Sequence, residues 1–437
     1  MRDEGNGDFR ETELGTLPVE WNVTTIGELF AIQQGASLSP KRRKGDSPRP
    51  FLRTANVFWS YLDLSKVDSM DFTDAEAEKL ALRSRDLLVC EGGDIGRTAM
   101  WRGEIKDCCY QNHLHRLRAI DSNIESEFYV YWMQAAFTLL DLYKGEGNKT
   151  TIPNLSQSRL KSFAVPIPPL PEQRAIARVL STIQRAMETQ DNLIAAAREL
   201  KKSLMRQLFT QGLNANGAVQ ETEIGVMPEH WELVKLGDVA SSPLKNGIFV
   251  KNPKWGEGIA YLNVADVYPS SSVNIRLLER MSISNDEVSK YRVNMGDVVF
   301  VRSSLKREGI AQATTVLKND EPIVYDNHLI KFSPDGSKLN SLYLSEYCRS
   351  EFGHGRLVAL SKTTTMTTIP QSNLANFVFP LPPLSEQGEI ARILATADKK
   401  IETEEKRKAA LQALFKTMLQ QLMTGQIRVT NLSYSTP

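Results

Sequence analysis

The stretch "PIPPLPEQRAIARVL" at residues 166–180 returns as "PLPPLSEQGEIARIL" at residues 380–394, 214 positions later. In each copy, a proline-rich segment is followed at once by apolar residues at helical spacing. Because proline disfavours helix in the residues before it, each copy predicts an extended exit from one domain and then a long helix. We expect these helices to begin at Glu172 and Glu386, each with an acid near the positive end of the helix dipole.

The repeat continues on both sides of this motif. Two further pairs are "ETELGTLPVEWNVTTIGEL" (11–29) with "ETEIGVMPEHWELVKLGDV" (221–239), and "YQNHLHRLR" (110–118) with "YDNHLIKFS" (325–333). Between residues 171–213 and 385–427, 16 of 43 aligned positions are identical. The chain is therefore a tandem duplication in the order domain, helix, domain, helix.

Composition indicates an ordinary globular protein of more than one domain. The chain has 437 residues, of which 41% are hydrophobic and 24% are charged. It has no apolar run of membrane-spanning length and no N-terminal secretory pattern, so we expect a cytoplasmic location and no membrane partner. The four cysteines lack metal-site spacing and are predicted to be buried, reduced thiols. A net charge of +1 means that any DNA binding must use a local basic face.

Each half reads as a mixture of helices and strands. The predicted strands include "FLRTANV" (51–57), "LLVC" (87–90) and "VVFV" (298–301). Capping boxes, Thr73 with Glu76 and Ser284 with Glu287, predict short helices at matching places. The apolar segment at 126–143 predicts a buried helix, with its counterpart at 339–352.

The two helical stretches carry apolar residues at alternating spacings of three and four, which is the pattern of a coiled coil. The predicted seam residues are Ile176, Leu180, Ile183, Met187, Ile194, Leu204 and Leu208 in the first helix, and Ile390, Leu394, Ile401, Leu411, Met418 and Leu422 in the second. Both seams are polar at the same level, at Gln190 and Glu404. We expect an intramolecular antiparallel pair of helices, each roughly 60 Å long.

These patterns predict an α+β fold: two mixed α/β domains in a pseudo-twofold tandem repeat, separated by two long helices packed as an antiparallel coiled coil. The expected boundaries are a first domain at 1–168, a first spacer helix at 169–213, a second domain at 214–382, and a second spacer helix with a tail at 383–437.

Signatures of catalysis are scarce. "GEGNKT" (145–150) and "EGGDIG" (91–96) lack the glycine spacing of phosphate-binding loops and are predicted to be ordinary loops. His113 and His328 recur in "NHL" without a second ligand at metal-site spacing, and we expect each to pack on a strand. No catalytic residue and no metal site is predicted.

Basic loops recur at equivalent places in the two halves. Lysine and arginine suit contacts to phosphates and base edges, and neighbouring hydroxyl groups can add polar contacts. A single run such as "KRRK" is most often a solvated surface, but duplicated basic loops favour a DNA-binding role. The candidate DNA-binding residues are Lys41, Arg42, Arg43, Lys44, Arg53, Thr54, Arg97, Lys149, Thr150, Thr151, Lys245, Lys251, Lys254, Arg302, Ser303, Lys306, Arg307, Lys362, Thr363 and Thr364.

Four motifs, repeated after a helix, resemble the specificity subunits of type I restriction-modification systems. They are "ELGTLPVEW" (13–21), "LRTANV" (52–57), "NKTTIPNLSQSRL" (148–160) and "PIPPLPEQRAI" (166–176). The resemblance covers nearly the whole chain, although the second half departs from the pattern at "TTIPQSN" (367–373) and "SEQGE" (385–389). Because the second half departs in this way, the resemblance does not predict the base sequence of either half-site.

The resemblance implies two target recognition domains, each reading one half of a bipartite, asymmetric site in double-stranded DNA, with the helices setting the gap. It implies two methyltransferase subunits, which methylate adenine at N6, and restriction subunits as partners. S-adenosylmethionine, ATP and Mg²⁺ are expected on those partners and none on this chain. The chain itself would be non-catalytic.

Two other readings stay open from the residues alone. A coiled-coil scaffold that binds only proteins would bind no DNA even with its partners present. A hidden methyltransferase or nuclease would bind S-adenosylmethionine or cleave DNA as the pure chain.

Overall fold

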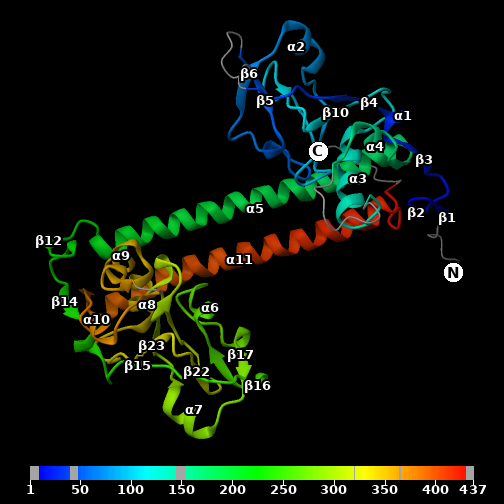
Figure 1. Cartoon of the computed structure of the whole chain (residues 1–437). Coiled ribbons are helices and arrows are strands. Elements are labelled where there is room, and N and C mark those ends of the chain that lie inside the picture. Colours follow the sequence, from blue (N-terminus) through cyan, green and yellow to red (C-terminus); the bar gives the residue numbers. More distant parts are fainter. Residues whose placement is uncertain (1–8, 40–47, 144–153, 319, 364–365, 430–437) are drawn as a thin grey trace. The chain divides into compact units, whose positions relative to one another are not determined.

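The computed structural model describes residues 9–39, 48–143, 154–318, 320–363 and 366–429. The chain divides into two compact units: unit 1 comprises residues 1–191 and 407–437, and unit 2 comprises residues 192–406. Helices α5 (Leu170–Gln211) and α11 (Leu384–Met423) each contribute one part to each unit (Figure 1). Among the described residues, no helix combines the length and apolar character needed to cross a membrane.

Unit 1 is built on a four-stranded antiparallel sheet with the strand order β4-β10-β7-β8. Its strands are β1 (Phe9–Thr12), β2 (Gly15–Pro18), β3 (Asn22–Thr25), β4 (Phe30–Gln34), β5 (Pro48–Leu52), β6 (Asp68–Asp71), β7 (Leu87–Cys90), β8 (Thr98–Met100), β9 (Cys109–Tyr110), β10 (Leu114–Ala119) and β11 (Ala164–Ile167). Its shorter helices are α1 (Ile26–Leu29), η2 (Thr54–Asn56), α2 (Asp74–Leu80), α3 (Ser126–Thr138) and α4 (Gln157–Lys161).

Unit 2 repeats this plan with a central sheet in the order β15-β23-β19-β21. Its strands are β12 (Val219–Thr222), β13 (Gly225–Pro228), β14 (Glu232–Lys235), β15 (Lys245–Asn246), β16 (Trp255–Leu262), β17 (Glu279–Met281), β18 (Arg292–Val293), β19 (Val298–Val301), β20 (Ser303–Ser304), β21 (Ala313–Thr315), β22 (Ile323–Tyr325), β23 (Leu329–Phe332), β24 (Lys362–Thr363), β25 (Thr367–Thr368) and β26 (Val378–Leu381). Its shorter helices are η3 (Leu236–Val239), α6 (Val264–Val267), η4 (Ile275–Leu277), α7 (Asn285–Tyr291), η5 (Arg307–Gly309), α8 (Ser341–Arg349), α9 (Glu351–Ala359) and α10 (Gln371–Ala375).

Several predicted elements are confirmed in position. The runs "LLVC" and "VVFV" are β7 and β19, and both capping boxes open the helices α2 and α7. Two predictions were too long. Only Phe51 and Leu52 of the run at 51–57 are strand, because the segment turns into η2. The buried helix predicted for 126–143 ends at Thr138, and its counterpart is split into α8 and α9.

In each unit, one end of α5 packs against the opposite end of α11. In unit 1, Ile176 and Leu180 share a core with Phe415, Leu419 and Leu422. In unit 2, the core instead contains Leu208 and Phe209 of α5 together with Ile390 and Leu394 of α11. The helices therefore run antiparallel within each unit, and all thirteen predicted seam residues are buried or half-buried.

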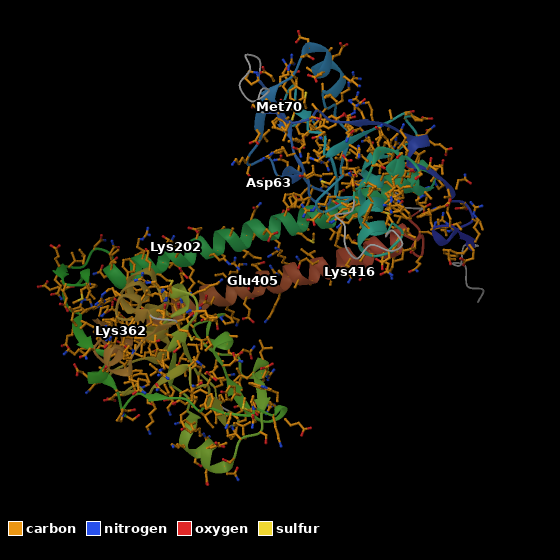
Figure 2. All side chains as sticks on the ribbon, viewed as in Figure 1. Asp63, Met70, Lys202, Lys362, Glu405 and Lys416 are labelled. Carbon is orange, nitrogen blue, oxygen red and sulfur yellow. The ribbon has the colours of Figure 1, made fainter. Side chains whose placement is uncertain are left out.

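Ion pairs join the two helices on their polar sides. Asp191 pairs with Lys408 in unit 1, and in unit 2 Arg198 Nη2 lies 2.5 Å from Glu405 Oε1. The outward surfaces of both helices stay charged: Lys202, Glu405 and Lys416 are exposed (Figure 2). Surface pairs of this kind add little to stability but are consistent with a fixed register.

The repeated motif is a joint that uses both of its polar side chains. Glu172 Oε2 accepts a hydrogen bond from Trp21 Nε1 over 3.0 Å. Gln173 Oε1 accepts from the backbone N–H of Glu125, which is the N-cap of α3, while its Nε2 donates to Pro168 O. Glu386 and Gln387 make the equivalent bonds in unit 2. The "EQ" pair thus ties each helix to the domain that precedes it.

The predicted helix starts were wrong by two residues. α5 begins at Leu170 and α11 at Leu384, so Pro171 lies inside the first turn of α5. Proline is tolerated there because the first amide groups of a helix have no partner within the helix. In unit 1, the carbonyl of Pro169 accepts from the backbone N–H groups of Glu172 and Gln173 and so completes that turn.

A third contact between helix and domain differs between the units. In unit 2, the buried Glu346 of α8 lies 3.0 Å from Lys201 Nζ, which also binds both carboxylate oxygens of Asp398 at 2.7 Å. In unit 1, Tyr131 of α3 packs edge-on against Phe415 and its Oη donates to Gln184 Oε1 over 3.1 Å. Lys201 and Phe415 are 214 positions apart, as are Gln184 and Asp398, so one site is ionic and its counterpart is neutral.

Candidate nucleic-acid interface

In unit 1, three connecting segments meet at one end of the central sheet. Gln34, the last residue of β4, pairs with His115, and Cys90, the last residue of β7, pairs with Leu114. The loop after β4, the loop after β7 and the turn Gln111–His113 before β10 therefore leave the sheet at the same end. We call this the loop end of unit 1.

Unit 2 has the same arrangement. Asn246 of β15 pairs with Ile330, and Val301 of β19 pairs with Leu329. The loop that begins at Gly247, the loop that begins at Arg302 and the turn Asp326–His328 form the loop end of unit 2. The two frames are superimposable in their hydrogen bonds, since the backbone N–H of Glu91 donates to His113 O and that of Arg302 donates to His328 O.

One glycine in each unit allows this close packing. A Cβ atom on Gly35 would lie 2.3 Å from Gln111 O, and a Cβ atom on Gly247 would lie 2.2 Å from Asp326 O. Real side chains do not approach a backbone carbonyl so closely, so only glycine lets the loop pass over the turn. The same close contact between loop and turn therefore shapes the loop end of both units.

The structure brings together several predicted residues at the loop end of unit 2. Ser303 and Ser304 form β20, which pairs with β25, and β25 pairs in turn with Lys362 and Thr363 of β24. Lys362 is exposed (Figure 2). Four residues predicted to lie in loops are in short strands instead, because these segments pair with one another or with β23: Lys245, Ser303, Lys362 and Thr363.

Other basic groups lie in the two loops that leave the sheet at this end. Arg302 is half-buried and its Nη1 donates to Asn327 O over 3.2 Å. Lys251, Lys254, Lys306 and Arg307 are exposed. The acids nearby are the exposed Glu308 and the half-buried Asp326, whose Oδ1 lies 2.8 Å from His328 Nδ1. Cations outnumber acids on this surface, so it is suited to a polyanion.

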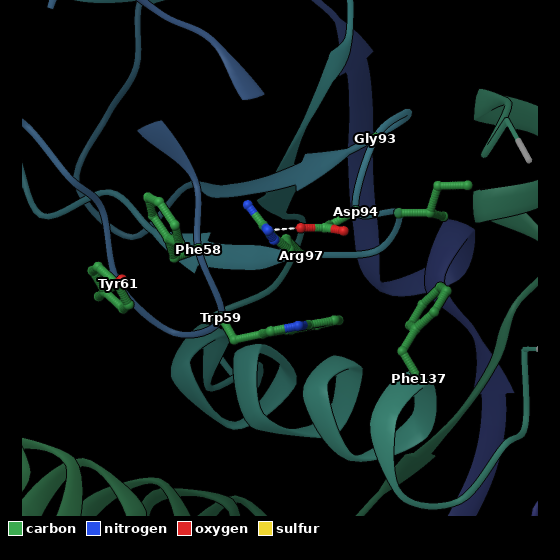
Figure 3. Close-up of a pocket in the computed structure, with 8 residues that line it drawn as sticks. Phe58, Trp59, Tyr61, Gly93, Asp94, Arg97 and Phe137 are labelled. Carbon is green, nitrogen blue, oxygen red and sulfur yellow. Dashed lines mark ion pairs between the residues drawn. The ribbon is translucent and has the colours of Figure 1, made fainter. Parts of the chain in front are cut away.

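At the loop end of unit 1, an aromatic pocket replaces part of the basic surface. Arg97 pairs with Asp94, and its guanidinium lies 5.0 Å from the centre of the Phe58 ring. Phe58 stacks on Tyr61 with the ring planes 7° apart (Figure 3). Together with Trp59 and Phe137, these residues line a pocket of about 570 Å³. A cation over a stacked aromatic pair suits a flat, electron-rich partner.

Arg53 and Thr54 follow β5, and Gln111 N donates to Leu52 O, so they lie near the same turn. Both are half-buried, and Arg53 Nη1 is 3.1 Å from Asp68 Oδ2. The remaining predicted residues, Lys41, Arg42, Arg43, Lys44, Lys149, Thr150, Thr151 and Thr364, lie outside the described residues.

One interpretation of the loop end needs correction. His113 and His328 do not pack on strands; both are exposed in the turn before a strand, and the buried histidine is His115. By strand register, Glu91 after β7 occupies the place that Arg302 occupies after β19. Glu91 is buried and its Oε2 accepts from Gln34 Nε2 over 2.8 Å. The same position is thus acidic in one unit and basic in the other.

The cysteines play no part in this surface. All four lie within the described residues, are buried and form no disulfide. Burial raises the pKa of the Cys90 and Cys108 thiols to about 12. The prediction of buried reduced thiols is confirmed.

The family of the chain follows from its two halves. The model of the type I restriction modification DNA specificity domain matches residues 18–197 and, a second time, residues 228–413. Together these stretches span most of the chain. The chain belongs to this DNA specificity family.

Relatives in the DNA specificity family match from end to end. The type I restriction enzyme MjaVIII specificity subunit of Methanocaldococcus jannaschii is 25% identical over 437 residues, covering 98% of this chain and 97% of the relative. The EcoKI specificity subunit of Escherichia coli strain K12 is 24% identical over 442 residues, covering 96% and 88%.

A solved structure agrees in fold with this member of the family. The crystal structure of the type I restriction-modification S subunit from M. genitalium superimposes with a TM-score of 0.58 at 15% sequence identity, covering 92% of this chain and 96% of that one. The predicted fold class, two mixed domains in tandem with two long helices, is confirmed.

The sequence patterns did not predict four residues that the structure places at the loop ends. His113 and His328 were assigned to strands because they precede apolar runs. Phe58 and Tyr61 lie in "NVFWSYLDL" (56–64), which carries three aromatic residues within four positions, and this density is a signal that could have identified the pocket.

Proposed function

We propose that this chain is the specificity subunit of a type I restriction-modification complex. Unit 1 and unit 2 would each read one half of a bipartite, asymmetric site in double-stranded DNA. The paired helices would set the number of base pairs between the half-sites. Arginine and lysine at the loop ends would contact phosphates and base edges, since these side chains match both kinds of acceptor.

The observation that carries the proposal is the divergence of the loop ends on one conserved frame. The same sheet order and the same glycine contact recur in both units, while the side chains differ at matching places, as with Glu91 and Arg302. A duplicated frame with different contact residues is what reading two different half-sites requires. Identical protomers would suit a palindromic site instead.

The helices support the spacer role and offer surfaces for partners. α5 has 42 residues and α11 has 40, far beyond an average helix of about 12 residues. We propose that two methyltransferase subunits and the restriction subunits assemble on this chain. The adenine N6 chemistry, S-adenosylmethionine, ATP and Mg²⁺ would then belong to those partners, with none of them bound by this chain.

The test is methylome sequencing of a methylation-free host that expresses the chain together with a type I methyltransferase subunit, or that subunit alone. A split, asymmetric N6-methyladenine motif that appears only when the chain is present is the expected result. If the complex assembles and no new motif appears, the proposal fails and the chain is a coiled-coil scaffold that binds only proteins.

A further inference from the structure

The loop end of unit 2 exposes two large apolar side chains. Leu305, in the loop after β19, is 85% exposed, and Phe249, in the loop after β15, is 71% exposed. Both loops leave the central sheet at the same end, since Val301 and Asn246 pair with adjacent residues of β23. Burying such a side chain against a partner is favourable in proportion to the apolar area removed from water.

The backbone around Leu305 is held in place. Ser304 is buried, and its Oγ donates to Lys306 O over 2.7 Å and accepts from Lys306 N over 3.2 Å. Ser304 is also part of β20, and η5 begins directly after Lys306. The exposure of Leu305 is therefore imposed by the structure on both sides of it.

The charges around these side chains indicate the kind of partner. Lys251 follows Phe249 by two positions, and Lys306 and Arg307 follow Leu305 directly; all three are exposed. A partner that covers these loops must therefore offer negative charge together with apolar surface. Double-stranded DNA has this combination, with phosphates at the rim of a groove and thymine methyl groups and base faces inside it.

We infer that Leu305 and Phe249 contact bases directly and contribute to the sequence preference of unit 2. The inference rests on the proposed function, because it requires the loop end to face DNA. The contact is apolar: Leu305 and Phe249 meet thymine methyl groups or a partly unstacked base step, as apolar side chains do in other DNA complexes.

The loop end of unit 1 also exposes apolar surface, but with different residues. Tyr61 is 48% exposed and stacks on Phe58, which lies under the Arg97 guanidinium. Its loop end thus offers aromatic faces where unit 2 offers an aliphatic side chain and a phenyl ring. Different apolar contacts in the two units are a source of different half-site preferences that charge alone does not supply.

The experiment uses the full chain in complex with its methyltransferase subunit and a duplex that carries its methylated motif. Affinity is measured over a range of KCl concentrations for Leu305→Ser, Phe249→Ser and Lys306→Gln. The matched control is Met295→Ser, since Met295 is 70% exposed but precedes β19 at the opposite end of that strand.

We expect Leu305→Ser and Phe249→Ser each to weaken binding by about 10- to 100-fold without changing the slope of log K against log salt. Lys306→Gln should reduce that slope by about one, because it removes a phosphate contact. Met295→Ser should bind as the wild type does. In methylome sequencing, Leu305→Ser should relax one half-site and leave the other unchanged.

Three results would overturn the inference, and they are distinguishable. If Leu305→Ser and Phe249→Ser bind and methylate as the wild type does, the apolar contact is wrong while the proposed function stands. If Leu305→Ser instead loses the methyltransferase subunit in a pull-down, the surface binds protein. If the wild-type complex binds no duplex, the proposed function itself fails and the inference fails with it.

Discussion

Trp21 and Glu172 are 151 positions apart in the chain, yet the indole Nε1 donates to the carboxylate Oε2 over 3.0 Å. Trp231 and Glu386 make the same bond in unit 2 over 3.1 Å. Each carboxylate has a second partner, which is Arg428 in unit 1 and His230 in unit 2. The first strands of each domain are thereby anchored to the first turn of the helix that follows that domain.

Replacing Trp21 with Phe removes this bond while keeping the ring buried. Hydrogen bonds to charged groups contribute about 1.5–3 kcal/mol, so unit 1 should lose stability in that range. Hydrogen exchange of α3 and of the start of α5 measures the loss locally. The control is Trp255→Phe, whose ring is 49% exposed, and a similar loss in that variant would argue against the assigned role.

The buried carboxyl of Glu346 should make unit 2 sensitive to pH. Burial raises its pKa above the usual value, an effect that Lys201 opposes and Asp398 reinforces; Arg349 is the other charge nearby. Because the folded state holds the Glu346 proton more tightly than the unfolded state does, the proton contributes most to the free energy of unfolding below the unfolded pKa near 4.5. This contribution is lost as the pH rises through the folded pKa. Wild-type unit 2 should therefore lose stability relative to Glu346→Gln from about pH 5 upward. Each pH unit crossed between the two pKa values corresponds to about 1.4 kcal/mol. Urea unfolding at several pH values measures the difference, and a constant difference would contradict the prediction.

The ionic site of unit 2 and the neutral site of unit 1 should not tolerate exchange of single residues. Lys201→Phe leaves Glu346 and Asp398 without their shared cation and should destabilise unit 2 by about 3–5 kcal/mol. The triple variant Lys201→Phe, Glu346→Tyr, Asp398→Gln copies the unit 1 set and should recover most of this loss. Hydrogen exchange of α8 reports both effects. Lys202→Phe, one residue along the helix and exposed, is the control.

Gly247→Ala should alter recognition by unit 2 alone, because the added Cβ would lie 2.2 Å from Asp326 O and displace the loop. Gly35→Ala should do the same for unit 1. Methylome sequencing of the two variants should show relaxed or lost recognition of a different half-site in each. Loss of the same half-site in both variants would contradict the assignment of one half-site to each unit.

The proposed spacer role of the two helices can be tested at the boundary between the units. The ion pair Asp191–Lys408 lies on one side of this boundary in both helices, and Arg198–Glu405 lies on the other. Inserting seven helical residues after Asp191 and seven after Lys406 keeps every described pair and adds roughly 10 Å to each helix. The recognised spacer should grow by about three base pairs with unchanged half-sites. A four-residue insertion in one helix only, which breaks the pairing, should abolish methylation.

The sequence predicted the duplication, the two helices and their seam, because apolar period and repeated motifs are local properties of the chain. It misjudged the helix starts, since the proline before Glu172 argued for extended backbone while Leu170 and Pro171 fit a first turn. It also did not reveal that Glu172 and Gln173 are the joint. Their partners are Trp21 and the N-cap of α3, and no local pattern links positions so far apart.

The loop end was predictable only in part. The basic loops are visible as runs of lysine and arginine, but their meeting at one end of a sheet depends on strand register. His113 and His328 precede apolar strands, and sequence alone cannot say that the turn leaves them exposed. Glu91 and Arg302 occupy the same place in the two frames, and only the strand register shows this equivalence.

Unit 1 contains both the β1–β2 hairpin near the start of the chain and the last turns of α11 near its end, whereas unit 2 is one uninterrupted segment. Gly212, just after α5, packs against Trp231, and Gly425, just after α11, packs against Trp21. Both helices therefore end against equivalent surfaces. Because unit 2 is uninterrupted, it can close as soon as residues 192–406 have left the ribosome, whereas unit 1 stays incomplete until Arg407 and the residues that follow it have been added.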